Sequence, residues 1–183
     1  MSTTPPRADR ALVAALRADL VAADFTVSGV GELLGPMAGA ALLRDHLLPA
    51  QRVTAADDSP RSSLVRLFSL GDPVDLAEAE RALPTLGVDG AAHLGLVAFE
   101  GDAVVALVDV RPYAADGIDH WIASDLGELA TGRPLLPDHV LGFGGASATL
   151  ASWTPRPQVR RALDLGTGCG VQALHLMPHA EEV

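Results

Sequence analysis

The stretch that most constrains the fold lies near the end of the chain, where a glycine loop separates two apolar segments. Residues 162–165 are expected to form a short buried strand, and an apolar helix is expected to begin at about Cys169. Gly166 and Gly168 allow a sharp turn and a close approach of the backbone to a ligand, because neither carries a Cβ. Gly170 lets the helix pack close to the strand. This order of strand, glycine loop and helix predicts the nucleotide-binding unit of a parallel α/β sheet.

The acidic residue beside this loop separates it from the two common phosphate-binding motifs. The pattern is Asp-x-Gly-x-Gly-x-Gly over 164–170, and the chain contains no lysine, which a P-loop requires. The glycine spacing also differs from the G-x-G-x-x-G of dinucleotide-binding folds. Asp164 would repel a pyrophosphate and would attract a cation, such as a sulfonium or the ammonium group of an amino acid.

With its aspartate and three glycines, this loop resembles motif I of the class I S-adenosylmethionine (SAM) methyltransferases. The resemblance implies that SAM is the cofactor and that Asp164 lies near its methionine end. The other residues that it implies as cofactor-binding are Gly166, Thr167, Gly168 and Gly170. The alternative interpretation is a structural strand, turn and helix without a ligand. No catalytic residue and no metal ligand is assigned.

The charge and cysteine content limit the partners and the compartment of the chain. Its 23 acidic residues outnumber its 13 arginines, for a net charge of −10, so bulk charge does not draw it onto nucleic acid. A single cysteine, Cys169, excludes an intrachain disulfide and favours the reducing cytoplasm. Residues 1–10 do not resemble a secretory signal, and no apolar run is long enough to span a membrane, so no membrane association is expected.

Helical patterns dominate the first half of the chain. After an expected disordered tail (1–6), Leu12, Leu16 and Leu20 recur every four residues and predict an amphipathic helix over 7–23. Capping residues and prolines delimit further helices, expected at 28–34, 38–48, 60–70 and 75–83. Residues 1–88 are therefore expected to form a helical domain, winged-helix-like in fold, that recognises a substrate or caps a catalytic domain.

Within this helical domain, four positions set the expected boundaries and the expected surface. Ser28 is the expected N-cap of the second helix, and Pro49 is expected to end the third. Arg61 and Arg66 offer only a weak basic face for a DNA-recognition helix. Strong nucleic-acid affinity is therefore not expected from this chain alone.

After Pro84 the pattern changes to short apolar runs typical of strands. The runs 93–99 and 103–110 flank Glu100-Gly101-Asp102 and predict a β-hairpin. A third strand is expected at 119–124, followed by one helical turn over 125–130. Residues 89–137 are thus assigned to a β-hairpin and a connector.

A second glycine cluster precedes the acidic loop. Gly142, Gly144 and Gly145 either bring the backbone near the same ligand or form a flexible connector. Residues 138–183 are assigned to the start of a SAM-binding Rossmann-like domain, so the expected fold class passes from α+β to α/β.

The domain order is similar to that of the release-factor glutamine methyltransferases (HemK/PrmC-like) and of related ribosomal RNA methyltransferases. The close match covers 160–177, and residues 138–157 are only loosely similar to the stretch that borders SAM in that family. The resemblance implies methylation of an amino or amide nitrogen, in a protein glutamine or a nucleic-acid base. The substrate, a release-factor-like protein or an RNA, would bind through a part of the protein beyond these residues.

Two absences distinguish this chain from a complete enzyme of that family. Only the first strand of the expected sheet is recognisable, and the family's Asn-Pro-Pro-Tyr motif is missing because the chain contains no asparagine. The chain is therefore interpreted as the N-terminal part of a methyltransferase, inactive alone. The alternative is a non-enzymatic, winged-helix-like binding module with a vestigial glycine loop. A nucleotide-binding oxidoreductase fragment is disfavoured by the glycine spacing.

Two further candidate sites lack the companion residues that their chemistry needs. Cys169 lies at an expected helix N-terminus, where a thiol is activated, but no partner His or Asp is evident. His175 and His179 are four residues apart, a spacing that can bind zinc on a helix, but Pro178 interrupts that helix and no third ligand is evident. Neither is assigned a role.

Overall fold

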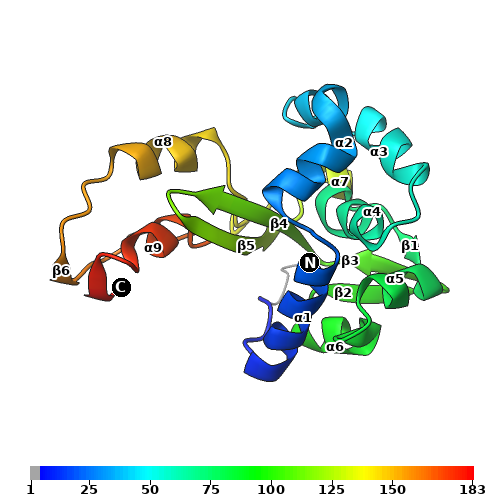
Figure 1. Ribbon diagram of the computed structural model, residues 1–183, viewed down its shortest axis with the longest axis horizontal. Helices are drawn as coiled ribbons and strands as arrows, with labels where there is room; N and C mark the ends of the chain where they lie inside the picture. The colour runs from blue at the N-terminus through cyan, green and yellow to red at the C-terminus, as the bar shows by residue number, and fades with distance from the viewer. Residues whose placement is uncertain (1–4) are drawn as a thin grey trace.

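The computed structural model describes residues 5–183 and has a mixed α+β fold (Figure 1). A body of helices with a small sheet occupies one side of the molecule. The two-stranded ribbon of β4 (Val108–Ala115) and β5 (Ile118–Asp125) extends from it to a C-terminal unit that contains α8 (Gly145–Trp153) and α9 (Val171–Leu176). The first four residues of the expected N-terminal tail lie outside the described part of the chain. In residues 5–183, no helix is both long enough and apolar enough to cross a membrane.

The first two helices begin at side-chain caps. Helix α1 (Arg10–Ala22) starts after Asp9, whose Oδ1 accepts the amide of Ala11 at 2.9 Å. Helix α2 (Val27–Leu42) starts after Thr26, whose Oγ1 accepts the amide of Gly29 at 2.9 Å. The cap predicted at Ser28 is therefore wrong by two residues. The break predicted before Pro36 is confirmed, since Gly35 has a φ of 65° and kinks α2.

The helix predicted at 38–48 is wrong at its C-terminal end. It stops at Leu42, and a separate helix α3 (Leu48–Ala55) follows a turn in which Asp45 has a φ of 61°. Pro49 lies in the first turn of α3 and does not end a helix, because the amide that proline lacks has no intrahelical partner there.

The helix predicted at 60–70 is confirmed in extent but changes type along its length. It begins as α4 (Pro60–Leu64), with Ser59 as its cap, and continues as the π-helix η1 (Val65–Leu70). Gly71, in the left-handed conformation, ends it. Pi-helical segments are rare and are frequent at functional sites.

The small sheet of the body has the strand order β1-β3-β2, with antiparallel pairing throughout. Its strands are β1 (Val74–Asp75), β2 (Val97–Glu100) and β3 (Ala103–Ala106). The hairpin predicted around residues 100–102 is confirmed, because β2 pairs with β3 across that turn. The strand predicted from residue 93 starts four residues later.

Two helices lie between β1 and β2 in the chain. Helix α5 (Leu76–Ala82) agrees with the predicted helix, whereas α6 (Gly87–Leu94) was not predicted. His93 therefore belongs to a helix and not to a strand, and Gly95, with a φ of 78°, ends that helix. Residue 88, the last of the expected helical domain, lies within α6.

One hydrophobic core joins the body helices, the small sheet and the start of the ribbon. Its largest fully buried side chains include Phe25 from the loop between α1 and α2, Phe68 and Leu64 from the helices, and Val104 from β3. Val110 of β4 belongs to the same cluster. The ribbon is thus anchored in the body at one end.

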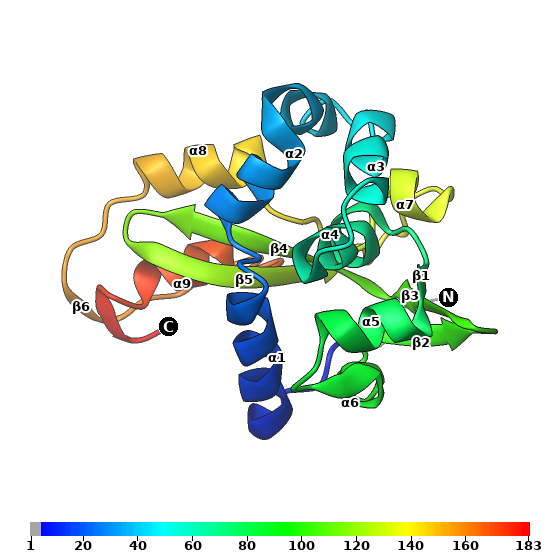
Figure 2. The same cartoon turned by 45° about the vertical axis from the view of Figure 1, so that its right-hand side comes forward.

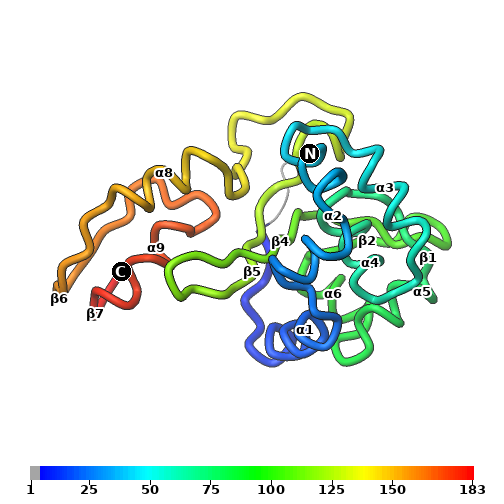
Figure 3. Tube along the Cα trace, turned by 45° about the horizontal axis from the view of Figure 1, so that its top comes forward, coloured from blue at the N-terminus to red at the C-terminus, as the bar shows by residue number. Residues whose placement is uncertain are grey.

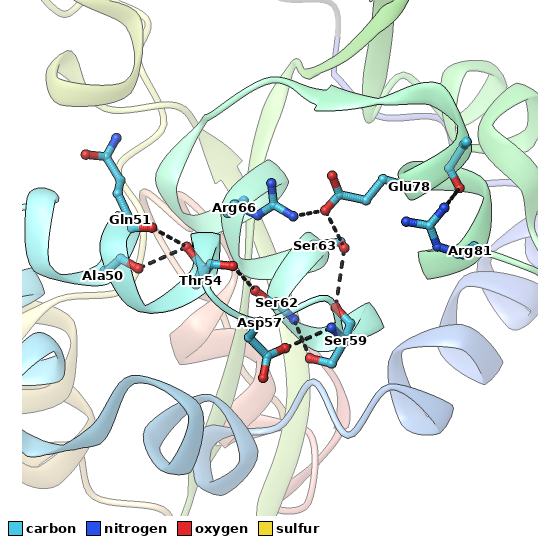
Figure 4. Close-up of polar contacts among 11 residues, drawn as sticks. Ala50, Gln51, Thr54, Asp57, Ser59, Ser62, Ser63, Arg66, Glu78 and Arg81 are labelled. Carbon is cyan, nitrogen blue, oxygen red and sulfur yellow. Dashed lines mark hydrogen bonds and ion pairs between the residues drawn. The ribbon is translucent and has the colours of Figure 1, made fainter.

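Buried polar contacts connect α3, α4, η1 and α5 (Figure 4). The Ser62 hydroxyl donates to the Thr54 carbonyl at 2.8 Å, and the Ser63 hydroxyl donates to Glu78 Oε1 at 2.6 Å. Arg66 pairs with the same carboxylate. Because these hydrogen-bonding groups are buried, their pairing avoids a desolvation cost of roughly 1–3 kcal/mol for each unsatisfied group.

The ribbon consists of β4 (Val108–Ala115) and β5 (Ile118–Asp125), paired antiparallel. The strand predicted at 119–124 is confirmed, but its partner is longer than expected and runs past 110 to 115. Asp116 and Gly117 form the turn, with φ values of 51° and 81°. An Asp-Gly pair with both residues left-handed is typical of a two-residue hairpin turn.

After the ribbon, α7 (Glu128–Thr131) returns toward the body and α8 (Gly145–Trp153) belongs to the C-terminal unit (Figures 1 and 2). The predicted turn at 125–130 corresponds to α7. Helix α8 was not predicted, because a glycine-rich segment is a poor helix former in isolation. Of the second glycine cluster, Gly145 begins this helix, whereas Gly142 and Gly144 precede it.

The last elements form a parallel βαβ unit (Figure 3). They are β6 (Val159–Arg161), α9 (Val171–Leu176) and β7 (Ala180–Glu182), with Val159 opposite Ala180. The helix expected from about Cys169 is confirmed, and β7 is a second parallel strand that was not expected.

The predicted buried strand at 162–165 is wrong in both position and burial. Strand β6 ends at Arg161, and the side chains of Leu163 and Leu165 are 83% and 90% exposed. The physical reason is pairing: β7 ends at Glu182 opposite Arg161, so no described strand lies beside 163–165.

Candidate functional site

The glycine loop between β6 and α9 brings all five predicted cofactor residues together. Thr167 Oγ1 donates to the carbonyl of Asp164 at 2.9 Å, and the Gly170 amide donates to the carbonyl of Thr167 at 2.9 Å. The φ values of Gly166, Gly168 and Gly170 are 75°, 56° and 86°. All three are left-handed, so any side chain there would strain the backbone.

The space beside these glycines is open. A Cβ built on Gly166 or Gly170 would meet no atom within 4 Å, and one on Gly168 would meet only the Gly166 carbonyl oxygen at 3.9 Å. The backbone conformation therefore accounts for the glycines, and the open face leaves room for a ligand.

Asp164 contributes an unusual carboxylate to this loop. Its Oδ2 atom is buried and accepts no hydrogen bond from any residue in the described range 5–183. A buried acceptor without a donor costs roughly 1–3 kcal/mol, and more when it is charged. A cationic or hydrogen-bond-donating ligand would remove that cost, which fits the expected ligand.

Helix α9, which begins at this loop, is held against the ribbon by a second small core. Tyr113, Ile122 and Val171 are buried together, and Leu174 packs against them. The aromatic ring of Phe143 meets Tyr113 edge-on, with ring centroids 4.6 Å apart. The ribbon tip and the glycine-rich segment thus support the helix that the glycine loop opens.

A polar contact completes this second core. The Tyr113 hydroxyl lies 2.5 Å from Nε2 of His175, a residue only 2% exposed. Burial lowers the pKa of His175 and the nearby Arg156 charge lowers it further, whereas Asp116 opposes the shift. Burial also raises the pKa of Tyr113. The geometry therefore fits a neutral imidazole whose Nε2 accepts a hydrogen bond from the tyrosine hydroxyl.

The other nitrogen of His175 faces charged groups without a direct hydrogen bond. Nδ1 lies 3.7 Å from Asp116 Oδ2, and Arg156 Nη1 contacts the same oxygen at 3.1 Å. In residues 5–183, no group of three His, Cys, Asp or Glu side chains is arranged to hold a metal ion. His175 therefore serves the packing of α9 on the ribbon.

The glycine cluster before α8 packs on the ribbon at one position. A Cβ on Gly142 would lie 2.8 Å from Ser124 Oγ of β5, so a side chain there would require the serine hydroxyl to move. Gly144 and Gly145 meet nothing within 4 Å. Helix α8 then contacts α9, where Gln172 Nε2 donates to the Ser147 carbonyl at 2.9 Å.

Arg61 and Arg66, the two arginines considered for DNA binding, both form ion pairs within the body and are not available to bind a phosphate. Arg61 pairs with Asp24 at 2.9 Å and donates to the Gly29 carbonyl at 2.8 Å. Arg66 pairs with Glu78. Both guanidinium groups are committed to contacts within the body.

A cleft of about 320 Å³ lies in the body, away from the glycine loop. It is bordered by the end of α2, by η1, β4 and α7, and it contains Asp109 and Arg111 of β4. The sequence analysis did not identify these two residues. The available signal was a pair of charged residues two apart in an apolar strand, which places both on one face.

Comparisons with known proteins cover the body of the molecule only. A protein-family model described as a domain of unknown function (DUF7059) matches residues 22–107. The matched span runs from the last residue of α1 through β3 and contains the whole small sheet. No curated protein and no solved structure matches the chain.

Proposed function

We propose that this chain is the N-terminal part of a SAM-dependent methyltransferase that modifies an amino or amide nitrogen. Residues 138–183 would then begin its Rossmann-like domain. The observation that carries the proposal is the acidic glycine loop between two parallel strands, with a buried Asp164 oxygen that lacks a donor. A cation-binding loop at the start of a helix in a parallel sheet is the arrangement that the motif predicts.

Five residues would hold the cofactor in this proposal. Asp164 would offer its carboxylate to the positively charged methionine end, where opposite charge is favourable. Gly166, Thr167, Gly168 and Gly170 would border the ligand with an open backbone face. When bound, SAM supplies an electrophilic methyl group on a sulfonium. The chain's own contribution is positioning and charge, which dominate transfer reactions of this kind.

The substrate in this proposal is a protein glutamine or a nucleic-acid base, bound in the cytoplasm. A release-factor-like protein or an RNA would be recognised through residues beyond this chain. The net charge of −10 and the internal pairing of Arg61 and Arg66 support no strong nucleic-acid affinity of the chain alone. The chain by itself is expected to be inactive.

The order of elements in the body supports the second candidate function, a winged-helix-like, non-enzymatic binding module. The order η1, β1, α5, α6, β2, β3 with sheet order β1-β3-β2 is that of a three-stranded sheet whose hairpin forms a wing. The family match at 22–107 contains this sheet and ends before the glycine loop. In that case the loop would be vestigial.

Ligand titration followed by amide NMR separates the two functions. SAM and S-adenosylhomocysteine are expected to shift the amides of Gly166, Gly168 and Gly170, weakly for this chain alone. Asp164→Asn should abolish the shifts, whereas Asp119→Asn, an exposed carboxylate on β5, should not. Shifts caused equally by ATP would overturn the SAM assignment. No shift with any nucleotide would favour the binding module.

A further inference from the structure

The cleft in the body combines an apolar wall with fixed charges. Leu129 of α7 and Leu47, which directly precedes α3, contribute apolar surface beside the buried Leu70 of η1, while Asp109 and Arg111 contribute charge from β4. Its volume of about 320 Å³ is at the lower end of the roughly 300–1,000 Å³ typical of ligand pockets. A cleft of this size and composition suits one long side chain or a small ligand.

The charges at the base of the cleft are already paired with each other. Arg111 Nε donates to Asp109 Oδ1 at 2.9 Å, and Nη2 lies 2.7 Å from Asp109 Oδ2. Asp109 is only 8% exposed, whereas the Arg111 side chain is 51% exposed. This two-point contact holds the guanidinium in place, and the carboxylate of Asp109 neutralises its positive charge.

Within residues 5–183, two further carboxylates at the cleft have no such cation. Asp45, at the turn between α2 and α3, and Glu128, at the start of α7, both border it. Glu128 accepts the amide of Leu135 at 3.1 Å, a contact that leaves its charge in place. Because Asp109 and Arg111 cancel, the cleft carries a net negative charge from these two residues.

We propose that this cleft binds an arginine or lysine side chain presented by a basic polypeptide. The leucine wall would pack on the methylene stem, and Asp45 and Glu128 would face the cationic end. The acidic lining and the chain's net charge of −10 oppose a phosphate-bearing ligand, so a protein fits better than RNA. The π-helix η1 supplies Ser69 and Leu70 to this lining.

Strand β4 connects this cleft with the helix that the glycine loop opens. Arg111 lies in the cleft, and Tyr113, two residues on, contacts His175 of α9. Two residues of a strand span roughly 7 Å. The cleft nevertheless binds without the glycine loop, so failure of one site does not imply failure of the other.

Amide NMR on the full chain tests the proposal with single-residue probes. N-acetyl-L-arginine amide is expected to shift the amides of Ser69, Leu70 and 127–130 saturably. The citrulline analogue, which has the same shape without the charge, should bind roughly five-fold more weakly. Equal binding of the two probes, or shifts confined to other residues, would overturn the proposal.

Charge-neutralising variants supply the matched control. The double variant Asp45→Asn with Glu128→Gln should weaken arginine binding roughly five-fold, because each exposed ion pair is worth up to about 1 kcal/mol. Asparagine tolerates the left-handed φ of position 45, and glutamine keeps the oxygen acceptor at 128. Glu32→Gln with Asp58→Asn, which removes two exposed carboxylates elsewhere, should leave binding unchanged. If both double variants weakened arginine binding equally, the net charge of the chain would explain the effect, and the proposed site would be refuted.

Two further experiments test whether the partner is a protein or an RNA, and whether this cleft binds independently of the cofactor loop. A fluorescent arginine-rich peptide is expected to bind the parent chain more tightly than it binds the Asp45→Asn, Glu128→Gln double variant. A short single-stranded RNA is expected to leave the cleft amides unshifted, and shifts there would contradict the choice of protein. Asp164→Asn should bind the arginine probe as the parent chain does, whatever its effect on SAM.

Discussion

The hydroxyl of Tyr113 and Nε2 of His175 lie 2.5 Å apart, although 62 residues separate them in the chain. One belongs to the ribbon and the other to α9, so this contact joins the anchored part of the molecule to the helix that begins at the glycine loop. Both groups are buried, so neither has water as an alternative partner. The contact therefore controls how firmly the candidate cofactor loop is held.

Tyr113→Phe is expected to loosen α9 without changing the body. The substitution keeps the aromatic packing and leaves Nε2 of buried His175 unpaired, at a cost of about 1–2 kcal/mol. Hydrogen exchange at the amides of α9 should accelerate, whereas exchange in η1 should not change. Trp153→Phe, at an exposed position of α8, serves as the control. Unchanged protection of α9 in Tyr113→Phe would mean that the contact contributes nothing.

The docking of α9 is expected to weaken as the pH falls below 6.5. Burial holds the pKa of His175 below its ordinary value of 6.5, so the unfolded state takes up the proton first. Well above pH 6.5 the imidazole is neutral in both states and adds no further pH dependence. Hydrogen exchange of α9 measured against pH should show this loss, and His175→Gln should remove it. His120→Gln, at an exposed position of β5, should leave the pH dependence in place.

Gly168→Ala is expected to destabilise the loop by roughly 1–2 kcal/mol through backbone strain alone. The added methyl group meets only one atom, the Gly166 carbonyl oxygen at 3.9 Å, so crowding does not contribute. Gly144→Ala is the matched control, because its φ of −154° suits any residue and its Cβ would also be unobstructed. Thermal unfolding of the C-terminal unit compares the two. An equal effect of both substitutions would rule out backbone strain as the cause.

Asp19→Ala is expected to destabilise the body by about 3 kcal/mol. The carboxylate is 1% exposed and accepts the amides of Thr85 and Leu86, with distances of 2.9 Å to Oδ1 and 2.8 Å to Oδ2. Its loss leaves those amides unpaired, and hydrogen bonds to charged groups are worth about 1.5–3 kcal/mol each. Urea unfolding measures the change, with Asp58→Ala, an exposed carboxylate, expected to stay within about 0.5 kcal/mol of the parent chain.

Helix caps and turn residues in the sequence predicted those helices and hairpins whose start or turn depends on neighbouring residues alone. Ser59-Pro60 predicted the start of α4, and the Gly101-Asp102 turn predicted the β2–β3 hairpin. The Asp116-Gly117 turn carried an equally strong hairpin signal, which the analysis overlooked. Helix α6 was missed because Gly87 and Gly90 lower its intrinsic helix propensity, and α8 was missed because a cluster of glycines precedes and begins it, so tertiary packing decides their conformation.

The candidate site likewise contains residues whose proximity is local in sequence and residues that only the fold brings together. The five loop residues lie within seven positions of sequence, so their proximity followed from the motif itself. Tyr113 contacts His175, and Arg111 and Glu128 border the same cleft, only because of the fold, and single-sequence patterns do not report such pairs. The strand at 162–165 was misplaced because burial of a strand depends on its neighbours, which the local apolar pattern does not specify.

The π-helical turn of η1 makes the shape of the cleft sensitive to chain length as well as to residue identity. An α-helix turns by about 100° for each residue. At unchanged chain length, a return of η1 to α-helical winding would therefore rotate Leu70 by about that angle away from the cleft wall, because the π-helix holds one more residue in the same turns. A single-residue deletion combined with α-helical winding would keep Leu70 at the wall, so the site depends on the match between chain length and winding, with no substitution among the side chains that line it.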